Sequence, residues 1–106
     1  MLQFPDIDPD AIRVLAFDAS NQLRPDEVLM GGVTILALIC TAGLDPNPNG
    51  MVIGPTSYDP AGRQMLVPVA PTLLRNGNDY EIEVASATNQ PPKLIVGRAL
   101  LSVRIS

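Results

Sequence analysis

The sequence contains no histidine, no tryptophan and one cysteine, and its aromatic residues are two tyrosines and two phenylalanines. Histidine has the unperturbed pKa best suited to proton transfer near neutrality, so its absence excludes most catalytic triads and most transition-metal sites. The thiol of Cys40 cannot form an internal disulfide. Because it lies in an apolar run, we expect it to act as a small buried hydrophobe.

Charge is also sparse, with 7 Lys plus Arg against 11 Asp plus Glu. The basic residues occur singly along the chain, whereas a nucleic-acid-binding surface would cluster them, so we expect no nucleic-acid partner. They are Arg13, Arg24, Arg63, Arg75, Lys93, Arg98 and Arg104. With 46% hydrophobic residues in a chain of 106, the composition predicts one folded domain with a single core.

An uncharged run, VLMGGVTILALICTAGL, extends over residues 28–44. A membrane-spanning helix needs about 20 apolar residues, and this shorter run contains Gly31, Gly32 and Gly43. We therefore expect a buried strand preceded by a glycine bulge, and no membrane partner. The opening MLQFPDIDPD is acidic and broken by prolines, which does not match a signal peptide and favours synthesis in a reducing compartment.

Eleven prolines and eight glycines divide the chain into short segments that alternate with a period of two, as half-buried strands do. Tyr80, Ile82 and Val84 alternate with Glu81 and Glu83, for example. The expected strands lie near residues 11–18, 27–30, 33–41, 50–54, 63–70, 79–88 and 93–105.

About seven short antiparallel strands in a chain of this length are typical of an immunoglobulin-like β-sandwich, with small antiparallel barrels as the main alternative. We expect an N-terminal arm over residues 1–10 and the sandwich over residues 11–106. Tyr80 follows a glycine-containing turn at a strand start, where a tyrosine corner would lie.

Carboxylates are the remaining catalytic option, but a glycosidase cleft usually has aromatic walls that this chain lacks. Phosphate-binding glycine loops are missing, and no motif surrounds the sole lysine, Lys93. We therefore predict no enzymatic activity and no cofactor. The carboxylates considered are Asp6, Asp8, Asp10, Asp18, Asp26 and Glu27.

The spacing of Asp6, Asp8 and Asp10 matches the start of a calcium loop, which requires a glycine at its sixth position and a carboxylate at its twelfth. Those positions hold Ala11 and Phe17. We expect instead that Asp8 caps a turn beginning at Pro9, and that the chain then enters a strand. No metal is predicted, and the three aspartates are the weak candidates for a looser oxygen site.

The segment DPDAIRVLAFDASNQL, residues 8–23, resembles the D-P-D-E-V-L-D-Y-x-V-D-W-S-x-x-L opening of small virion proteins of tailed bacteriophages, the fibre-tail adaptor or neck proteins. The matching positions are Asp8, Pro9, Asp10, Asp18, Ser20 and Leu23. Ala19 replaces the tryptophan of that pattern, and Val14 replaces an acidic residue. The segments NGNDYEIEVASATN and RALLSVRIS are similar to later strands of the group. The resemblance implies an immunoglobulin-like domain that assembles in several copies at the neck or tail and carries other components.

In the central strand we expect Ile35, Ala37 and Ile39 on one face and Leu36, Leu38 and Cys40 on the other. A strand that is apolar on both faces needs a cover on the second face. Either a neighbouring subunit or the N-terminal arm could supply it.

The sequence thus predicts an oligomeric virion adaptor that is assembled in the host cytoplasm and contacts other neck, tail or fibre proteins. A capsid decoration protein and a loop-based carbohydrate or ligand module with calcium are the alternatives. The interface candidates are Leu2, Phe4, Ile7, Leu36, Leu38, Asp45, Asn47, Asn49, Gln90, Pro91, Pro92 and Lys93.

Overall fold

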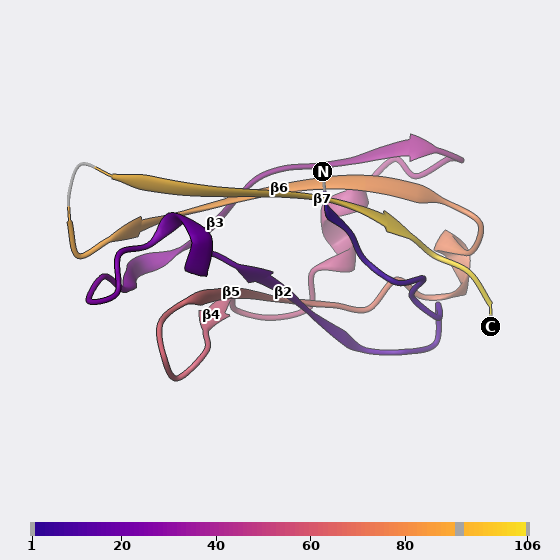
Figure 1. Ribbon diagram of the computed structural model, residues 1–106. Helices are drawn as coiled ribbons and strands as arrows, with labels where there is room; N and C mark the ends of the chain where they lie inside the picture. Colours follow the sequence, from indigo (N-terminus) through magenta and orange to yellow (C-terminus); the bar gives the residue numbers. More distant parts are fainter. Residues whose placement is uncertain (1, 91–92, 106) are drawn as a thin grey trace.

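The computed structural model describes residues 2–90 and 93–105, and within them seven strands and three short 3-10 turns occur, with no α-helix (Figure 1). The strands are β1 (Leu2–Gln3), β2 (Arg13–Asp18), β3 (Leu29–Ala42), β4 (Ser57–Tyr58), β5 (Gln64–Val69), β6 (Asp79–Thr88) and β7 (Leu94–Ser102). The 3-10 turns are η1 (Ser20–Gln22), η2 (Pro48–Met51) and η3 (Leu73–Arg75).

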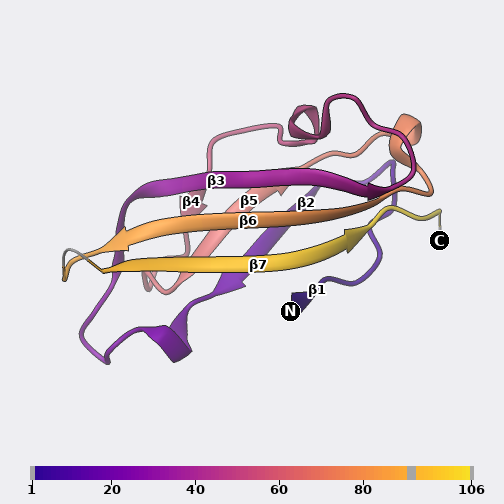
Figure 2. The ribbon, with the colours of Figure 1, turned by 90° about the horizontal axis from the view of Figure 1, so that it is seen from above.

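The strands form two facing sheets, one ordered β1-β7-β6-β3 and the other β2-β5-β4. Figure 2 shows β3, β6 and β7 running side by side, with β3 at one margin of their sheet and β1 at the other. All pairs are antiparallel except β1 with β7, which is parallel. The prediction of an all-β sandwich is confirmed, and the division into four and three strands matches that of immunoglobulin-like domains.

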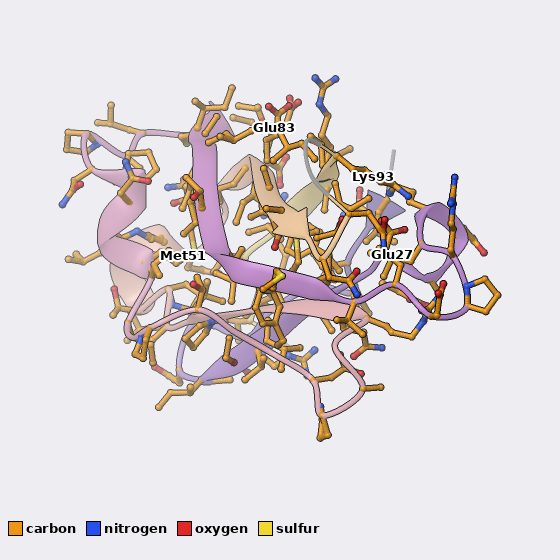
Figure 3. All side chains as sticks on the ribbon, turned by 90° about the vertical axis from the view of Figure 1, so that its left-hand side faces the viewer. Glu27, Met51, Glu83 and Lys93 are labelled. Atoms are coloured by element: carbon orange, nitrogen blue, oxygen red, sulfur yellow. The ribbon has the colours of Figure 1, made fainter. Side chains whose placement is uncertain are left out.

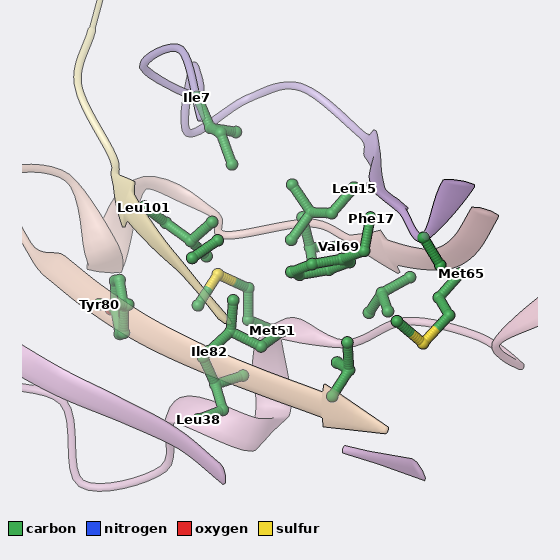
Figure 4. Packing of buried hydrophobic residues seen from close by; sticks show 14 of the residues in the cluster. Ile7, Leu15, Phe17, Leu38, Met51, Met65, Val69, Tyr80, Ile82 and Leu101 are labelled. Carbon is green, nitrogen blue, oxygen red and sulfur yellow. The ribbon is translucent and has the colours of Figure 1, made fainter. Parts of the chain in front are cut away.

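The core lies between the sheets and follows the two-residue period of the sequence (Figure 4). Tyr80, Ile82 and Val84 of β6 have no exposed surface, and neither has Leu101 of β7. The opposite sheet contributes residues such as Phe17, which is 3% exposed. The predicted alternation in β6 is therefore confirmed.

One predicted strand is wrong. Residues 50–54 do not form a strand, because η2 occupies 48–51 and Val52 makes only an isolated bridge to Val69. Proline at the start of η2 favours a turn over a ladder, and Met51 of the same turn is fully buried in the core. The short strand β4 was not predicted.

The predicted segment 33–41 and the second half of the predicted segment 27–30 belong to one long strand, β3, which begins at Leu29. Its register against β6 shifts between Met30 and Val33, where Gly31 and Gly32 have φ of 87° and 94°. Such positive φ values favour glycine, so the predicted glycine bulge is confirmed. The strand is not buried on both sides, however, because its outward side chains are exposed.

The predicted N-terminal arm is packed into the sandwich. The amide of Ile7 donates to the Ser102 carbonyl at 2.9 Å, and the Arg104 amide donates to the Ile7 carbonyl at 3.0 Å. The side chain of Ile7 is fully buried, and the ring of Phe4 meets that of Phe17 edge-on at 5.2 Å. Ile7 therefore belongs to the core, and Phe4 packs against it.

Tyr80 begins β6 as predicted, but it does not make the bond of a tyrosine corner. In that motif the hydroxyl bonds to backbone a few residues upstream. Here the Tyr80 hydroxyl donates to Asp45 Oδ2 at 2.8 Å and accepts from Asn78 Nδ2 at 3.1 Å. The carboxylate takes the place of the backbone acceptor.

Candidate functional site

The strand β3 is the terminal strand of its sheet: in the described part of the chain it pairs with β6, and no strand pairs with its other edge. Val33 and Ile35 pack against the core but are only partly buried, whereas Ile82 and Val84 on β6 have no exposed surface. This difference is expected for an open edge, since a terminal strand has a neighbour on one side only.

The outward side of β3 is uncharged and largely apolar. Met30, Leu36 and Ile39 are 50%, 49% and 50% exposed, and the segment LMGGVTILALICTA contains no charged residue and no proline. Edge strands of soluble proteins usually carry a charge or a proline that prevents another strand from pairing. The strand β3 has neither a charge nor a proline, and of the features that protect sheet edges it has the irregularities in its pairing with β6.

The predicted division of β3 into two faces is wrong beyond Ile35. The register against β6 shifts between Ile35 and Ala37, and an extra residue in a strand moves the following side chains to the other face. Leu38 is consequently a core residue at 5% exposure, while Ala37 and Ile39 lie on the exposed side with Leu36. Among the interface candidates, Leu36 remains at the surface and Leu38 does not.

The interface candidates in the N-terminal arm also differ in how exposed they are. Leu2 is 48% exposed, Phe4 packs against Phe17 and Ile7 is fully buried. The arm runs along β7, on the far side of the sheet from β3 (Figure 2). The expectation that it could cover β3 is wrong, because pairing with β7 directs it into the core at the opposite edge.

At one end of the sandwich two leucines are almost fully exposed, Leu44 at 87% after β3 and Leu74 at 91% in η3. They border a hollow of about 360 Å³ whose other lining residues include Asp45 and Arg75. Apolar side chains with so little cover are candidate contact points for another protein.

A polar network holds these two loops together. Arg75 Nε donates to Asp45 Oδ2 at 2.7 Å, and Arg75 Nη2 donates to the Asn47 carbonyl at 2.9 Å. Burial opposes ionisation of Asp45, but hydrogen bonds from Asn47, Tyr80 and Arg75 outweigh it and lower its pKa. Burial raises the pKa of Tyr80 to about 12. The predicted interface residue Asp45 thus fixes the loop, whereas Asn47 and Asn49 have exposed side chains.

At the opposite end Glu27 lies inside a second network (Figure 3). Its carboxylate accepts from Lys93 Nζ at 2.7 Å, from Thr88 Oγ1 at 2.9 Å and from the Arg24 amide at 3.0 Å. The hydrogen bond from Lys93 is the main cause that lowers the pKa of Glu27 to about 2. Lys93 therefore ties the β6–β7 hairpin to the 20–27 loop.

Of the other candidates in that hairpin, Gln90 is exposed. Together with Lys93 and Glu27 it lines a hollow of about 340 Å³. Pro91 and Pro92 lie outside the described residues.

The aspartates of the N-terminal segment form a turn, as predicted. Asp8 Oδ1 accepts from the Asp10 amide at 2.9 Å, and the Asp8 carbonyl accepts from the Ala11 amide at 3.0 Å. Asp6 and Asp8 line a hollow with Arg13 and Arg104. No group of three or more His, Cys, Asp or Glu side chains suited to a metal ion occurs among residues 2–90 and 93–105.

The exposed leucines and the partner of Glu27 were not predicted from the sequence. Leu74 belongs to the stretch APTLLRNGNDY, whose turn residues predict an exposed loop. That signal could have identified Leu74 as a surface residue. No local signal pairs Glu27 with Lys93, because they lie in different loops and meet only in the folded chain.

Comparison of the chain with protein-family models, with curated proteins and with solved structures gave no match. Among the described residues, no helix has the length and hydropathy needed to cross a membrane.

Proposed function

We propose that this chain is a non-catalytic structural protein of a tailed-phage virion, an oligomeric adaptor at the neck or tail that joins other virion components, including fibres. The observation that carries the proposal is β3, a long uncharged strand with exposed apolar side chains at the margin of an otherwise well-packed sandwich. A surface of this kind marks a contact with another protein.

Two further observations support a role based on contact. Within the part of the chain that the structure describes, every buried side-chain nitrogen and oxygen has a hydrogen-bond partner. The polar groups of the two end networks are thus used to hold loops in place. The resemblance of residues 8–23 to virion adaptors supplies the biological setting, with assembly in the host cytoplasm.

Electron microscopy of purified phage particles labelled with an antibody against this chain tests the proposal. We expect label at the neck or tail in a fixed copy number. Label spread over the capsid would favour a decoration protein instead. Absence of the chain from purified particles would refute the virion role altogether.

A further inference from the structure

We propose that two copies of this chain associate through the free edges of their β3 strands, pairing antiparallel about a two-fold axis to join two four-stranded sheets into one. This inference rests on the proposed function, since an oligomeric adaptor needs contacts between copies. It goes further by naming the surface and the partner, which is the same strand of a second copy.

The open edge of β3 supplies the chemistry. The Thr56 hydroxyl donates to the Val33 carbonyl at 3.0 Å and so closes the edge at that point. For residues 34–42 the structure gives, within its described part, the ladder to β6 and a bond from Cys40 Sγ to the Ala42 carbonyl. The amides and carbonyls directed away from β6 are therefore free to pair with another strand.

Charge favours a second copy as that strand. Across a two-fold axis each residue near the axis meets the same residue or a close neighbour, so any charge there would face a like charge. The strand β3 has no charge along its whole length, although the chain carries 18 ionisable Asp, Glu, Lys and Arg residues. A partner with a charged strand would gain nothing from this neutrality, whereas in self-pairing it prevents like charges from meeting at the axis.

The register follows from the faces of the strand. Between the irregularities at Ile35/Ala37 and Cys40/Ala42, β3 runs regularly from Ala37 to Cys40. Directly opposed residues of an antiparallel pair lie on the same face, so the axis must pass through a residue position. An axis at Ile39 sets Ile39 opposite its own copy on the exposed face and Leu38 opposite Cys40 on the core face.

The contact area sets the strength of this dimer. Residues 34–42 extend about 30 Å at roughly 3.4 Å per residue, and a strip about 10 Å wide gives roughly 300 Å² on each copy. Stable interfaces bury about 800 Å² per partner. Leu44, just beyond the strand, adds apolar surface. The dimer is accordingly weak in dilute solution and becomes fully populated where a particle holds copies close together.

Sedimentation velocity from micromolar to near-millimolar protein tests the proposal, with Ile39→Lys as the disrupting variant. The matched control is Val14→Lys on β2, a terminal strand of the other sheet, because Val14 is 59% exposed and Ile39 is 50% exposed. We expect a concentration-dependent dimer for the wild type and for Val14→Lys. In Ile39→Lys we expect association to weaken by about tenfold or more, because opposed like charges destabilise a strand pair.

A wild type that stays monomeric throughout this range overturns the proposal, as does a dimer that survives Ile39→Lys or is lost equally in Val14→Lys. If circular dichroism shows that Ile39→Lys does not fold, Ile39→Glu replaces it, because a shorter charged side chain at this half-exposed position still meets its own copy across the axis. A monomeric chain that is still found in purified particles would overturn the β3 interface alone. A β3 dimer that is missing from particles would instead overturn the virion function.

Discussion

Replacement of Ile7 by alanine tests whether the N-terminal segment belongs to the core. The side chain of Ile7 is fully buried, while its backbone bonds to Ser102 and Arg104 would survive the change. Ile7→Ala removes about three methylene equivalents at ~0.8 kcal/mol each, or about 2.4 kcal/mol, and the cavity left behind adds to this. We expect a loss of about 3 kcal/mol, a large fraction of the 5–15 kcal/mol typical of a domain.

Urea unfolding at low protein concentration, followed by circular dichroism, measures this loss. With a slope of about 1–3 kcal/mol per molar urea, the midpoint should fall by about 1–3 M without a change in slope. Leu2→Ala is the control, since Leu2 lies in the same segment but is 48% exposed, and it should cost less than about 1 kcal/mol. If Ile7→Ala costs no more than Leu2→Ala, the segment is not part of the folding unit and the packing argument fails.

Two further predictions concern acid stability and core packing. The pKa of Glu27 is lowered from 4.5 to about 2 in the folded chain, so its stabilising contribution is present above about pH 4.5 and is lost as the pH falls toward 2. Glu27→Gln should therefore lose less stability than the wild type between pH 7 and pH 3 in urea titrations, and an equal loss would contradict the assigned ion pair. A Cβ at Gly97 would meet Phe17 Cδ2 at 2.9 Å, whereas one at Gly54 would meet Pro68 Cγ at 3.6 Å. Gly97→Ala should cost about 1–3 kcal/mol and Gly54→Ala should be neutral or stabilising by up to about 1 kcal/mol; thermal melts that rank the two in the opposite order would refute the close packing of Phe17 on β7.

Local patterns predicted the elements whose structure depends on neighbouring residues in the chain. The alternation of Tyr80, Ile82 and Val84 identified the buried face of β6, because successive side chains of a strand point to opposite sides. The pair Gly31 and Gly32 identified the bulge, since only glycine takes positive φ without strain. The strand expected at residues 50–54 was wrong, because the turn η2, which begins at Pro48, extends to Met51.

The candidate contact surface was only partly predictable. Leu36 was identified from the apolar run, but the irregularity before Ala37 placed Leu38 in the core and Ile39 at the surface. A bulge of this kind is set by pairing with β6, and the sequence of β3 alone contains no glycine there to indicate it. The turn residues around Leu74 indicate that it is exposed, but that Leu44 and Leu74 border one hollow depends on how the two loops meet.

By itself the sequence determined that this is a small all-β domain without histidine chemistry, because composition and a two-residue period are properties of the chain alone. Only the tertiary structure decided that β3 lies at a sheet margin, that Ile7 fills the core and that Glu27 meets Lys93. Each of these features depends on which distant segments pair with one another. Strand pairing is set by the packing of the whole sandwich, and a two-residue period within one strand does not determine it.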